Sequence, residues 1–180
     1  LPLSQEEKRQ MEAILDRFPL SIPPYYLSLI DFSDPNDPIR KMAIPSIAET
    51  DLSGSFDTSG EQDNTVVEGL QHKYAQTAML LSTNQCAMYC RHCFRKRLVG
   101  LSDAEIAKRF DAMAAYIRAH EEITNVLVSG GDALLNHNDR LETLLSLLSG
   151  IDHLDVIRIG SRTPVVFPQR ILEDLDLQRV

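Results

Sequence analysis

Three cysteines near the middle of the chain lie close enough together in the sequence to hold a metal centre. They are the only cysteines among 180 residues, and Cys86, Cys90 and Cys93 have the spacing C-x3-C-x2-C. Thiolates are the usual protein ligands of iron–sulfur clusters. Three of them can bind three irons of a cubane and leave its fourth iron without a protein ligand. The spacing therefore predicts a [4Fe–4S] cluster with one iron open to a reactive small molecule.

Two other interpretations of the cysteines stay open. A structural zinc site needs a fourth ligand, and His92 is adjacent to Cys93, a poor position for joining the same tetrahedron. Another histidine could complete that site. The three residues could also be unliganded packing cysteines. An iron–sulfur cluster is favoured over both, because three cysteines within eight positions are improbable by chance.

Basic residues surround the cysteines although the protein as a whole is acidic. Arg91, Arg95, Lys96 and Arg97 accompany the cysteine run in a chain whose net charge is −8. These four side chains could simply form a solvated surface. Arginine, however, binds carboxylate and phosphate groups in bidentate fashion. We therefore expect at least one of the four to contact an anionic ligand beside the cluster.

Short apolar runs alternate with amphipathic helical segments in the second half of the chain. The predicted strands are residues 78–83, 125–129 and 155–160. A capping box at residues 102–105 opens the first predicted helix, whose apolar face begins at Ile106, and the second helix ends at Gly150. Strands that alternate with helices form right-handed crossovers and a parallel sheet. The predicted fold class is therefore α/β.

Each predicted strand is followed by residues that could contact a ligand. The cysteine loop follows the first strand, Gly130-Gly131-Asp132 the second and Ser161-Arg162-Thr163 the third. Ligands bind at the carboxyl ends of parallel strands, so these segments are expected to line one mouth. Glycines there let a ligand approach the backbone, and Asp132 can accept a hydrogen bond from an ammonium group. Lys73 and Tyr74 precede the first strand. Their position in the sequence alone therefore places them at the amino ends of the strands, opposite the mouth.

The chain divides into two parts at about residue 70. Residues 1–69 are predicted to be a helical and loop segment that opens with a capped helix over residues 4–18. Within this segment, residues 51–64 are polar and are expected to form a surface loop or a lid, of which the surface loop is favoured. Residues 70–180 hold all the predicted strands. The third predicted strand lies shortly before the last residue, Val180. We therefore expect the chain to be part of a longer protein.

Composition narrows the partners and the location. Hydrophobic residues make up 43% of the chain, but no apolar run approaches the ~20 residues that span a bilayer. The acidic pI of about 5.1 argues against nucleic-acid and membrane-surface partners. An odd number of clustered cysteines suits a reducing compartment better than a disulfide framework. The predicted location is therefore the cytoplasm.

Five stretches of the sequence carry more specific patterns. They are residues 34–40, His72-Lys73-Tyr74, residues 86–93, Ser129-Gly130-Gly131-Asp132 and residues 159–166. Together they resemble the radical S-adenosylmethionine (SAM) enzymes, and specifically the lysine 2,3-aminomutase family. The resemblance implies a partial TIM-type (β/α)6 barrel. This chain would hold the first three βα units, preceded by a helical N-terminal segment.

The resemblance also implies a cofactor set. Cys86, Cys90 and Cys93 would hold a [4Fe–4S] cluster that cleaves SAM reductively, and an external donor such as flavodoxin or ferredoxin would supply the electron. The residues expected to contact SAM are Ser129, Gly130, Gly131, Asp132, His92, Ser161 and Arg162.

In the aminomutases, pyridoxal 5′-phosphate (PLP) holds the amino-acid substrate while its amino group moves from C2 to C3. By resemblance, Arg95 would face the carboxylate of a lysine-like substrate, and Lys73 with Tyr74 would reach the PLP phosphate. Lys73 and Tyr74 would then have to fold across the mouth or serve a neighbouring subunit, so a homo-oligomer is compatible with this assignment. No nucleic-acid or membrane partner is expected.

Two departures from the family keep other functions open. Lys73 and Thr77 stand where lysine-specific members have arginines for the phosphate. In the family, the PLP-bearing lysine and the carboxylates that bind the substrate side chain belong to later barrel strands. The resemblance places those strands outside this chain. The alternatives are a branch that isomerises a lysine destined for a translation factor, a PLP-independent radical SAM enzyme, and a non-catalytic iron–sulfur or zinc module.

Overall fold

A five-stranded mixed sheet forms the centre of the computed structural model, which describes residues 3–100 and 106–180. The strands follow one another across the sheet in chain order: β1 (Thr65–Val67), β2 (Leu70–Tyr74), β3 (Thr77–Leu81), β4 (Asn125–Ser129) and β5 (Val156–Ile159). Strands β3, β4 and β5 are parallel, whereas β1, β2 and β3 pair in antiparallel fashion. The predicted α/β class and parallel strands are confirmed. The antiparallel pair before them was not predicted.

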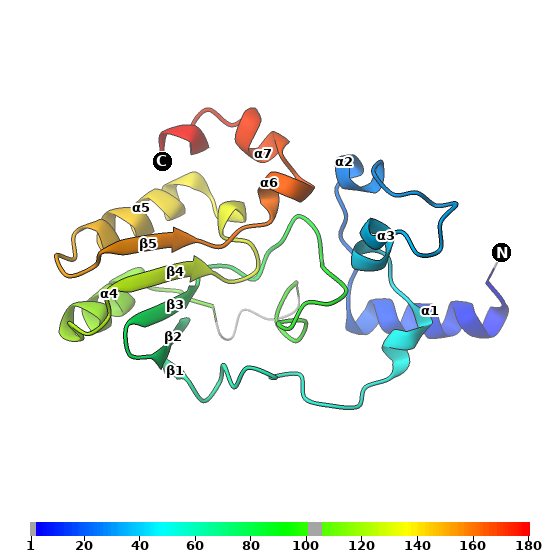
Figure 1. Cartoon of the computed structure of the whole chain (residues 1–180), viewed down its shortest axis with the longest axis horizontal. Coiled ribbons are helices and arrows are strands. Elements are labelled where there is room, and N and C mark those ends of the chain that lie inside the picture. The colour runs from blue at the N-terminus through cyan, green and yellow to red at the C-terminus, as the bar shows by residue number, and fades with distance from the viewer. Residues whose placement is uncertain (1–2, 101–105) are drawn as a thin grey trace.

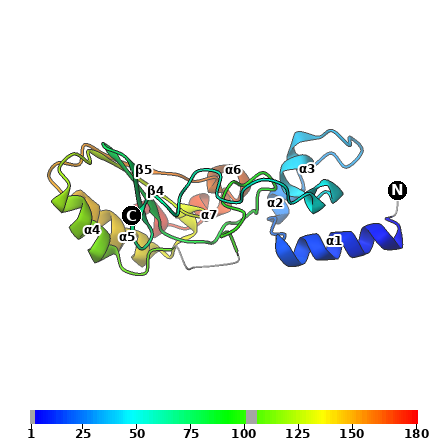
Figure 2. The ribbon, with the colours of Figure 1, turned by 90° about the horizontal axis from the view of Figure 1, so that it is seen from below.

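Helices and short helical turns connect and flank the strands. They are α1 (Gln5–Arg17), α2 (Pro24–Leu27), α3 (Pro38–Ala43), η1 (Ile47–Thr50), α4 (Phe110–Ala119), η2 (Ala133–Leu135), α5 (Asn138–Ser149), α6 (Thr163–Val166), α7 (Gln169–Leu172) and η3 (Leu177–Arg179). Helices α4 and α5 lie side by side along one face of the sheet (Figure 2). The other face of the sheet is left for the cavity described below.

The core lies between the sheet and these two helices. Alternate residues of β3 and β4 point to the helices, because successive strand side chains face opposite sides. Ala78, Leu80, Val126 and Val128 are all fully buried there, against Ile117 and its neighbours on α4 and α5. Burial of a large aliphatic side chain contributes about 1.5–3 kcal/mol. This layer therefore holds the parallel strands rigidly in register.

The helix after the cysteine loop begins later than the sequence predicts. The predicted capping box at residues 102–105 lies outside the described residues. Helix α4 begins at Phe110, and Ile106 packs instead with Leu81 and Leu98 in a separate cluster. The prediction that Ile106 shares the apolar face of this helix is therefore wrong. The apolar spacing alone did not show where the connecting segment gives way to the helix.

The N-terminal helices form the opposite end of an elongated molecule, and the cysteine loop runs between them and the sheet (Figure 1). The predicted first helix is confirmed as α1. Its N-cap Ser4 accepts from the backbone N–H of Glu7 (3.2 Å), and the Glu7 carboxylate accepts from the N–H of Ser4 (2.8 Å). In the described part of the chain, no helix is both long enough and apolar enough to cross a membrane.

Candidate cofactor site

The cysteine loop and the turns after β4 and β5 meet around one cavity of about 200 Å³, as the sequence predicts. Its cysteine and polar lining residues are Cys86, Cys90, Cys93, Ser129, Asp132, Ser161 and Arg162. We call this cavity the cysteine mouth. Its apolar walls include Met88, Val99 and Val166. Segments that are separate in the sequence meet there because all three follow the carboxyl ends of parallel strands.

The three thiols of the cysteine mouth are free and half-buried. Burial raises the pKa of the Cys86 and Cys93 thiols, and the Asp132 carboxylate raises that of Cys86 further. Bound metal reverses this effect, because a cation holds coordinating sulfur in the thiolate form. Arg162 supplies a further positive charge, donating from Nη1 to Cys90 Sγ at 3.0 Å. Three thiols on one small cavity fit the ligand set of an iron–sulfur cluster.

Two glycines let the turn after β4 lie directly against the cysteine loop. Gly130 has φ +126°, and a Cβ at Gly130 would lie 2.3 Å from the carbonyl oxygen of Thr83. A Cβ at Gly131 would lie 2.3 Å from the carbonyl oxygen of Gln85. The Gly131 N–H donates to Thr83 O at 2.6 Å, so the two segments are joined backbone to backbone. Glycine is required here for close approach as well as for conformation.

Asp132 joins the turns after β4 and β5. Its carboxylate is 3% exposed and accepts from Ser161 Oγ (2.6 Å) and from the N–H groups of Arg162 (2.7 Å), Thr163 (2.8 Å) and Leu134 (3.1 Å). A carboxylate has about four acceptor sites, and the protein fills all of them. The observed role of Asp132 is thus to fix the cysteine mouth. Its contact with an ammonium group stays a prediction.

The basic residues of the cysteine loop divide into two sets. Arg91 is buried and pairs with Glu49 (2.6 Å), while donating to the carbonyl oxygens of Phe18 (3.2 Å) and Pro19 (3.0 Å). Lys96 also pairs with Glu49. Burial acts to raise the pKa of Glu49, but hydrogen bonds from these two cations hold it below its ordinary value. Arg91 and Lys96 therefore anchor the N-terminal segment.

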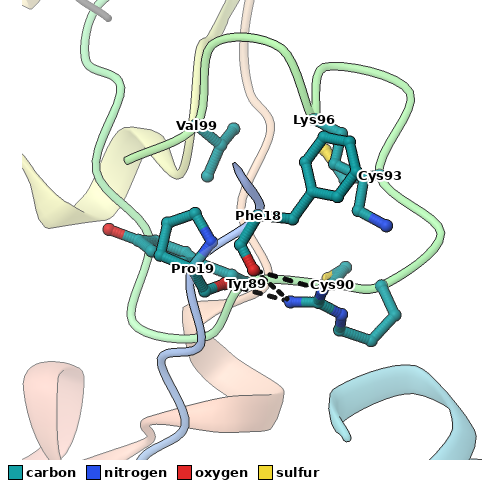
Figure 3. A pocket seen from close by; sticks show the side chains of 8 residues that line it. Phe18, Pro19, Tyr89, Cys90, Cys93, Lys96 and Val99 are labelled. Carbon is teal, nitrogen blue, oxygen red and sulfur yellow. Dashed lines mark hydrogen bonds between the residues drawn. The ribbon is translucent and has the colours of Figure 1, made fainter. Parts of the chain in front are cut away.

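That anchored segment covers the outer side of the cysteine loop. Figure 3 shows Phe18 and Pro19 packed against Cys90, Cys93 and Lys96. The Lys96 ammonium lies 4.4 Å from the centre of the Phe18 ring. His92, in contrast, is exposed and does not line the cysteine mouth. Its predicted contact with SAM stays a prediction, and the described residues offer no support for it as a zinc ligand beside the cysteines.

A second cavity of about 240 Å³ lies along the sheet face that the helices leave uncovered. Its lining includes all three residues predicted to contact PLP or substrate, Lys73, Tyr74 and Arg95. We call it the sheet cavity. Tyr74 pairs with Thr77 at the start of β3, so the predicted edge position is right. The cavity extends along the sheet from this edge to Arg95. Tyr74 and Arg95 therefore line the same cavity although they lie at opposite ends of the strands.

His72 fixes the direction of its neighbour Lys73. His72 lies on the helix side of β2, where Nδ1 bonds the Tyr116 hydroxyl and Nε2 bonds Ala75 O, both at 3.1 Å. Lys73, the next residue along the strand, consequently faces the sheet cavity. His72 also lies near His120 and Glu122, and their potential metal-ligand atoms are within 4.8 Å of one another. Both ring nitrogens of His72 are already bonded, so this group has a packing role.

Arg95 connects the two cavities. Its Nη1 donates to Ser129 Oγ and to Gly130 O, both at 3.3 Å, on the side of the cysteine mouth. Its Nη2 lies 2.8 Å from Met79 Sδ, which lines the sheet cavity. Arg95 thus lines the sheet cavity and reaches the cysteine mouth through its hydrogen bond to Ser129, which lines that mouth. This continuity is the main geometric finding of the site.

Comparison with known proteins relates the chain to one group of enzymes, although no protein-family model matches it. It is 46% identical to the L-lysine 2,3-aminomutase of Acetoanaerobium sticklandii and 44% identical to that of Clostridium subterminale, in each case over 178 residues and 97% of this chain. The chain is a homologue of the lysine 2,3-aminomutases. It is also 41% identical to the glutamate 2,3-aminomutase of Clostridioides difficile over 97% of its length. It spans 42–43% of the length of these aminomutases.

The aminomutase likeness covers both cavities, but sequence reasoning missed two acidic residues that hold them together. Glu49 pairs with the cysteine loop, and Glu61 pairs with Arg95. Residues 51–64 were expected to form a surface loop, yet Glu61 is 3% exposed and lines the sheet cavity. That expectation is therefore wrong for the end of the loop. A polar, glycine-containing sequence gives no signal that one of its acids is buried against a distant arginine.

Proposed function

We propose that the full-length protein is a radical SAM aminomutase that moves the amino group of lysine, or of a related amino acid, from C2 to C3. The observation that supports this most strongly is the pair of cavities joined at Arg95. One cavity offers three free thiols, and the other offers two cations, Lys73 and Arg95. The names of the homologous aminomutases favour the same chemistry.

The cysteine mouth fits the cofactors that this reaction needs. Cys86, Cys90 and Cys93 would hold a [4Fe–4S] cluster, which when bound supplies the electron for reductive cleavage of SAM. Gly130 and Gly131 let the turn after β4 pack closely against the segment that leads into the cysteine loop, and by resemblance they belong to the proposed SAM set. Ser129, Asp132, Ser161 and Arg162 line or fix the same space, and His92 belongs to the proposed SAM set by resemblance. The apolar residues of the mouth help to exclude water from it.

The sheet cavity fits an anionic amino-acid adduct. Arg95 would bind the carboxylate of a lysine-like substrate, because its guanidinium is always charged and its Nη2 faces this cavity. Lys73 and Tyr74 would bind the PLP phosphate at the other end of the cavity. PLP, when bound, holds the substrate through its amino group. The protein's own contribution is to orient the substrate beside the cysteine mouth and to balance its charge.

The broader organisation completes the proposal. Strands β3, β4 and β5 would be the first three strands of a (β/α)6 barrel, with residues 1–69 as a helical and loop segment and residues 70–180 as the start of the barrel. The enzyme would work in the cytoplasm with flavodoxin or ferredoxin as electron donor, and a homo-oligomer is compatible with this proposal. No nucleic-acid or membrane partner is proposed.

The direct test uses the full-length protein, reconstituted anaerobically with iron, sulfide and PLP. We expect it to convert L-lysine or L-glutamate to the 3-amino isomer when SAM and a reductant are present. Nuclear magnetic resonance or mass spectrometry of the derivatised amino acids detects the product. Loss of product when SAM is omitted is the control. Absence of the isomer from both substrates, with a fully loaded cluster, would contradict the proposal.

A second candidate is a radical SAM enzyme of this family that works without PLP or that modifies a lysine destined for a translation factor. Thr77 favours it, because Thr77 and Lys73 line the sheet cavity where lysine-specific members have two arginines. A single cation there makes a weaker phosphate site. Titration of the full-length protein with PLP separates the two candidates. Saturable visible absorbance from bound PLP supports the aminomutase, and its absence supports the second candidate.

A further inference from the structure

Glu61 is a buried acid that contacts the arginine joining the two cavities. It is 3% exposed, and its Oε1 accepts from Arg95 Nε at 2.7 Å. Its Oε2 lies 3.5 Å from Arg97 Nη2. One carboxylate thus spans two arginines of the cysteine loop. Because all three side chains are largely buried, these charges are weakly screened by solvent.

The loop that carries Glu61 is itself held in place. Asp57 accepts from the backbone N–H of Glu61 at 2.9 Å and from that of Gln62 at 3.1 Å. The Thr65 hydroxyl donates to the carbonyl oxygen of Glu61 at 2.8 Å. Lys73 Nζ, on β2, donates to Ser59 O at 2.9 Å. The end of the loop is therefore a built wall of the sheet cavity.

Glu61 determines which donors of Arg95 remain for a ligand. The guanidinium is held on one side by Glu61 at Nε and on another by Ser129 Oγ and Gly130 O at Nη1. Nη2 is the nitrogen left beside the sheet cavity, where its protein contact is a thioether sulfur. A thioether is a weak acceptor. A ligand carboxylate would therefore meet Arg95 through Nη2, in a direction set by Glu61.

We propose that Glu61 is a positioning residue for Arg95, fixing the guanidinium so that Nη2 binds the carboxylate of the amino-acid substrate. This inference rests on the proposed function, in which Arg95 receives that carboxylate. Glu61 would stay in place when substrate binds, since displacement would strip a buried carboxylate of its shortest cationic partner. The sheet cavity retains net positive charge, because two cations, Lys73 and Arg95, line it together with one acid, Glu61.

The test compares Glu61→Gln and Glu61→Asp in the full-length, PLP-loaded protein. The matched control is Glu68→Gln, which makes the same change in an exposed pair with Lys108 (3.2 Å). Each variant is titrated calorimetrically with L-lysine and with L-lysinamide, which lacks the carboxylate. Steady-state kinetics with L-lysine give KM and kcat. Iron content and circular dichroism show whether each variant folds and loads its cluster.

We expect Glu61→Gln to weaken L-lysine binding and raise KM by roughly tenfold, the scale of a charge-assisted hydrogen bond. Binding of L-lysinamide and cluster content should change little. Glu61→Asp, which keeps the charge, should recover part of the loss, and Glu68→Gln should match the wild type. If Glu61→Gln does not fold, the comparison of the two ligands in Glu61→Asp carries the test.

Three results from the Glu61 variants would overturn the inference. An unchanged L-lysine affinity would show that Arg95 does not need Glu61. Equal losses for L-lysine and L-lysinamide would show a structural effect only. Tighter L-lysine binding would show that Glu61 competes with the substrate. Failure of the proposed function is seen separately, as a wild-type protein that forms no 3-amino isomer. In that case the ratio of the L-lysine and L-lysinamide affinities still tests the role of Glu61. If the wild type binds neither ligand, both proposals are overturned.

Discussion

The two cavities that meet at Arg95 are built in different ways. The cysteine mouth is held by main-chain contacts between strand-end turns, such as the 2.6 Å hydrogen bond from Gly131 N to Thr83 O. The sheet cavity is held by side-chain ion pairs between segments far apart in the sequence, such as Glu61 with Arg95. The first arrangement is rigid because the parallel strands fix it. The second depends on individual side chains, so we expect single substitutions to change it.

The largest expected effect is loss of the metal centre. In the full-length protein, Cys90→Ser should abolish formation of the [4Fe–4S] cluster, because two thiolates do not hold a cubane firmly. Iron and sulfide analysis with visible absorption measures the loss. Tyr89→Phe, one position away, keeps all three thiols and serves as the control. Wild-type iron content in Cys90→Ser would show that the cysteine mouth does not hold the cluster.

The next effect tests the main-chain construction of the cysteine mouth. Gly131→Ala would place a methyl group 2.3 Å from Gln85 O, so the two segments must separate. We expect a loss of about 2–3 kcal/mol in the free energy of unfolding, as overpacking produces, together with reduced cluster loading. Urea denaturation of the full-length protein measures the change in the free energy of unfolding.

Gly150→Ala is the matched control for that substitution. Its Cβ would meet nothing closer than 3.6 Å, and φ at Gly150 is −84°, which suits any residue. The control should leave cluster loading unchanged. If Gly131→Ala were as stable and as well loaded as Gly150→Ala, the rigid main-chain contact would not be what forms the mouth.

The smallest expected effect belongs to the sheet cavity. Lys73→Met should weaken PLP binding by roughly tenfold through loss of one charge-assisted contact. Cluster loading should not change, because Lys73 does not line the cysteine mouth. Absorbance titration with PLP gives the affinity, and Lys108→Met, in an exposed ion pair, is the control. An unaltered PLP affinity would show that the phosphate does not bind at Lys73.

The same contrast explains how much the sequence could predict. Local patterns predict the cysteine mouth. Apolar runs indicate parallel strands, and Cys86, Gly130 and Ser161 follow the carboxyl ends of these strands. Chain order then brings these residues together without knowledge of side-chain packing. The α/β class and the convergence of the three segments were predictable for this reason.

The sheet cavity depends on pairings that the sequence does not display. The partners of Arg95 and Arg91 are Glu61 and Glu49, which are 34 and 42 residues away. Glu61 lies in a segment whose composition is typical of surface loops, and Glu49 lies in the short helical turn η1. The antiparallel strand β2 was also hidden, because Leu70–Tyr74 is short and mixes apolar with charged residues. Burial of such residues depends on tertiary contacts, which local patterns do not specify.

The most direct test of the central claim asks whether the cysteine mouth supports reductive cleavage of SAM. The full-length protein is reconstituted anaerobically, mixed with SAM and dithionite, and analysed for 5′-deoxyadenosine by liquid chromatography and mass spectrometry. We expect 5′-deoxyadenosine from the wild type and none above background from Cys90→Ser. A wild-type protein that carries its full complement of iron and sulfide, yet releases no 5′-deoxyadenosine, would contradict the claim.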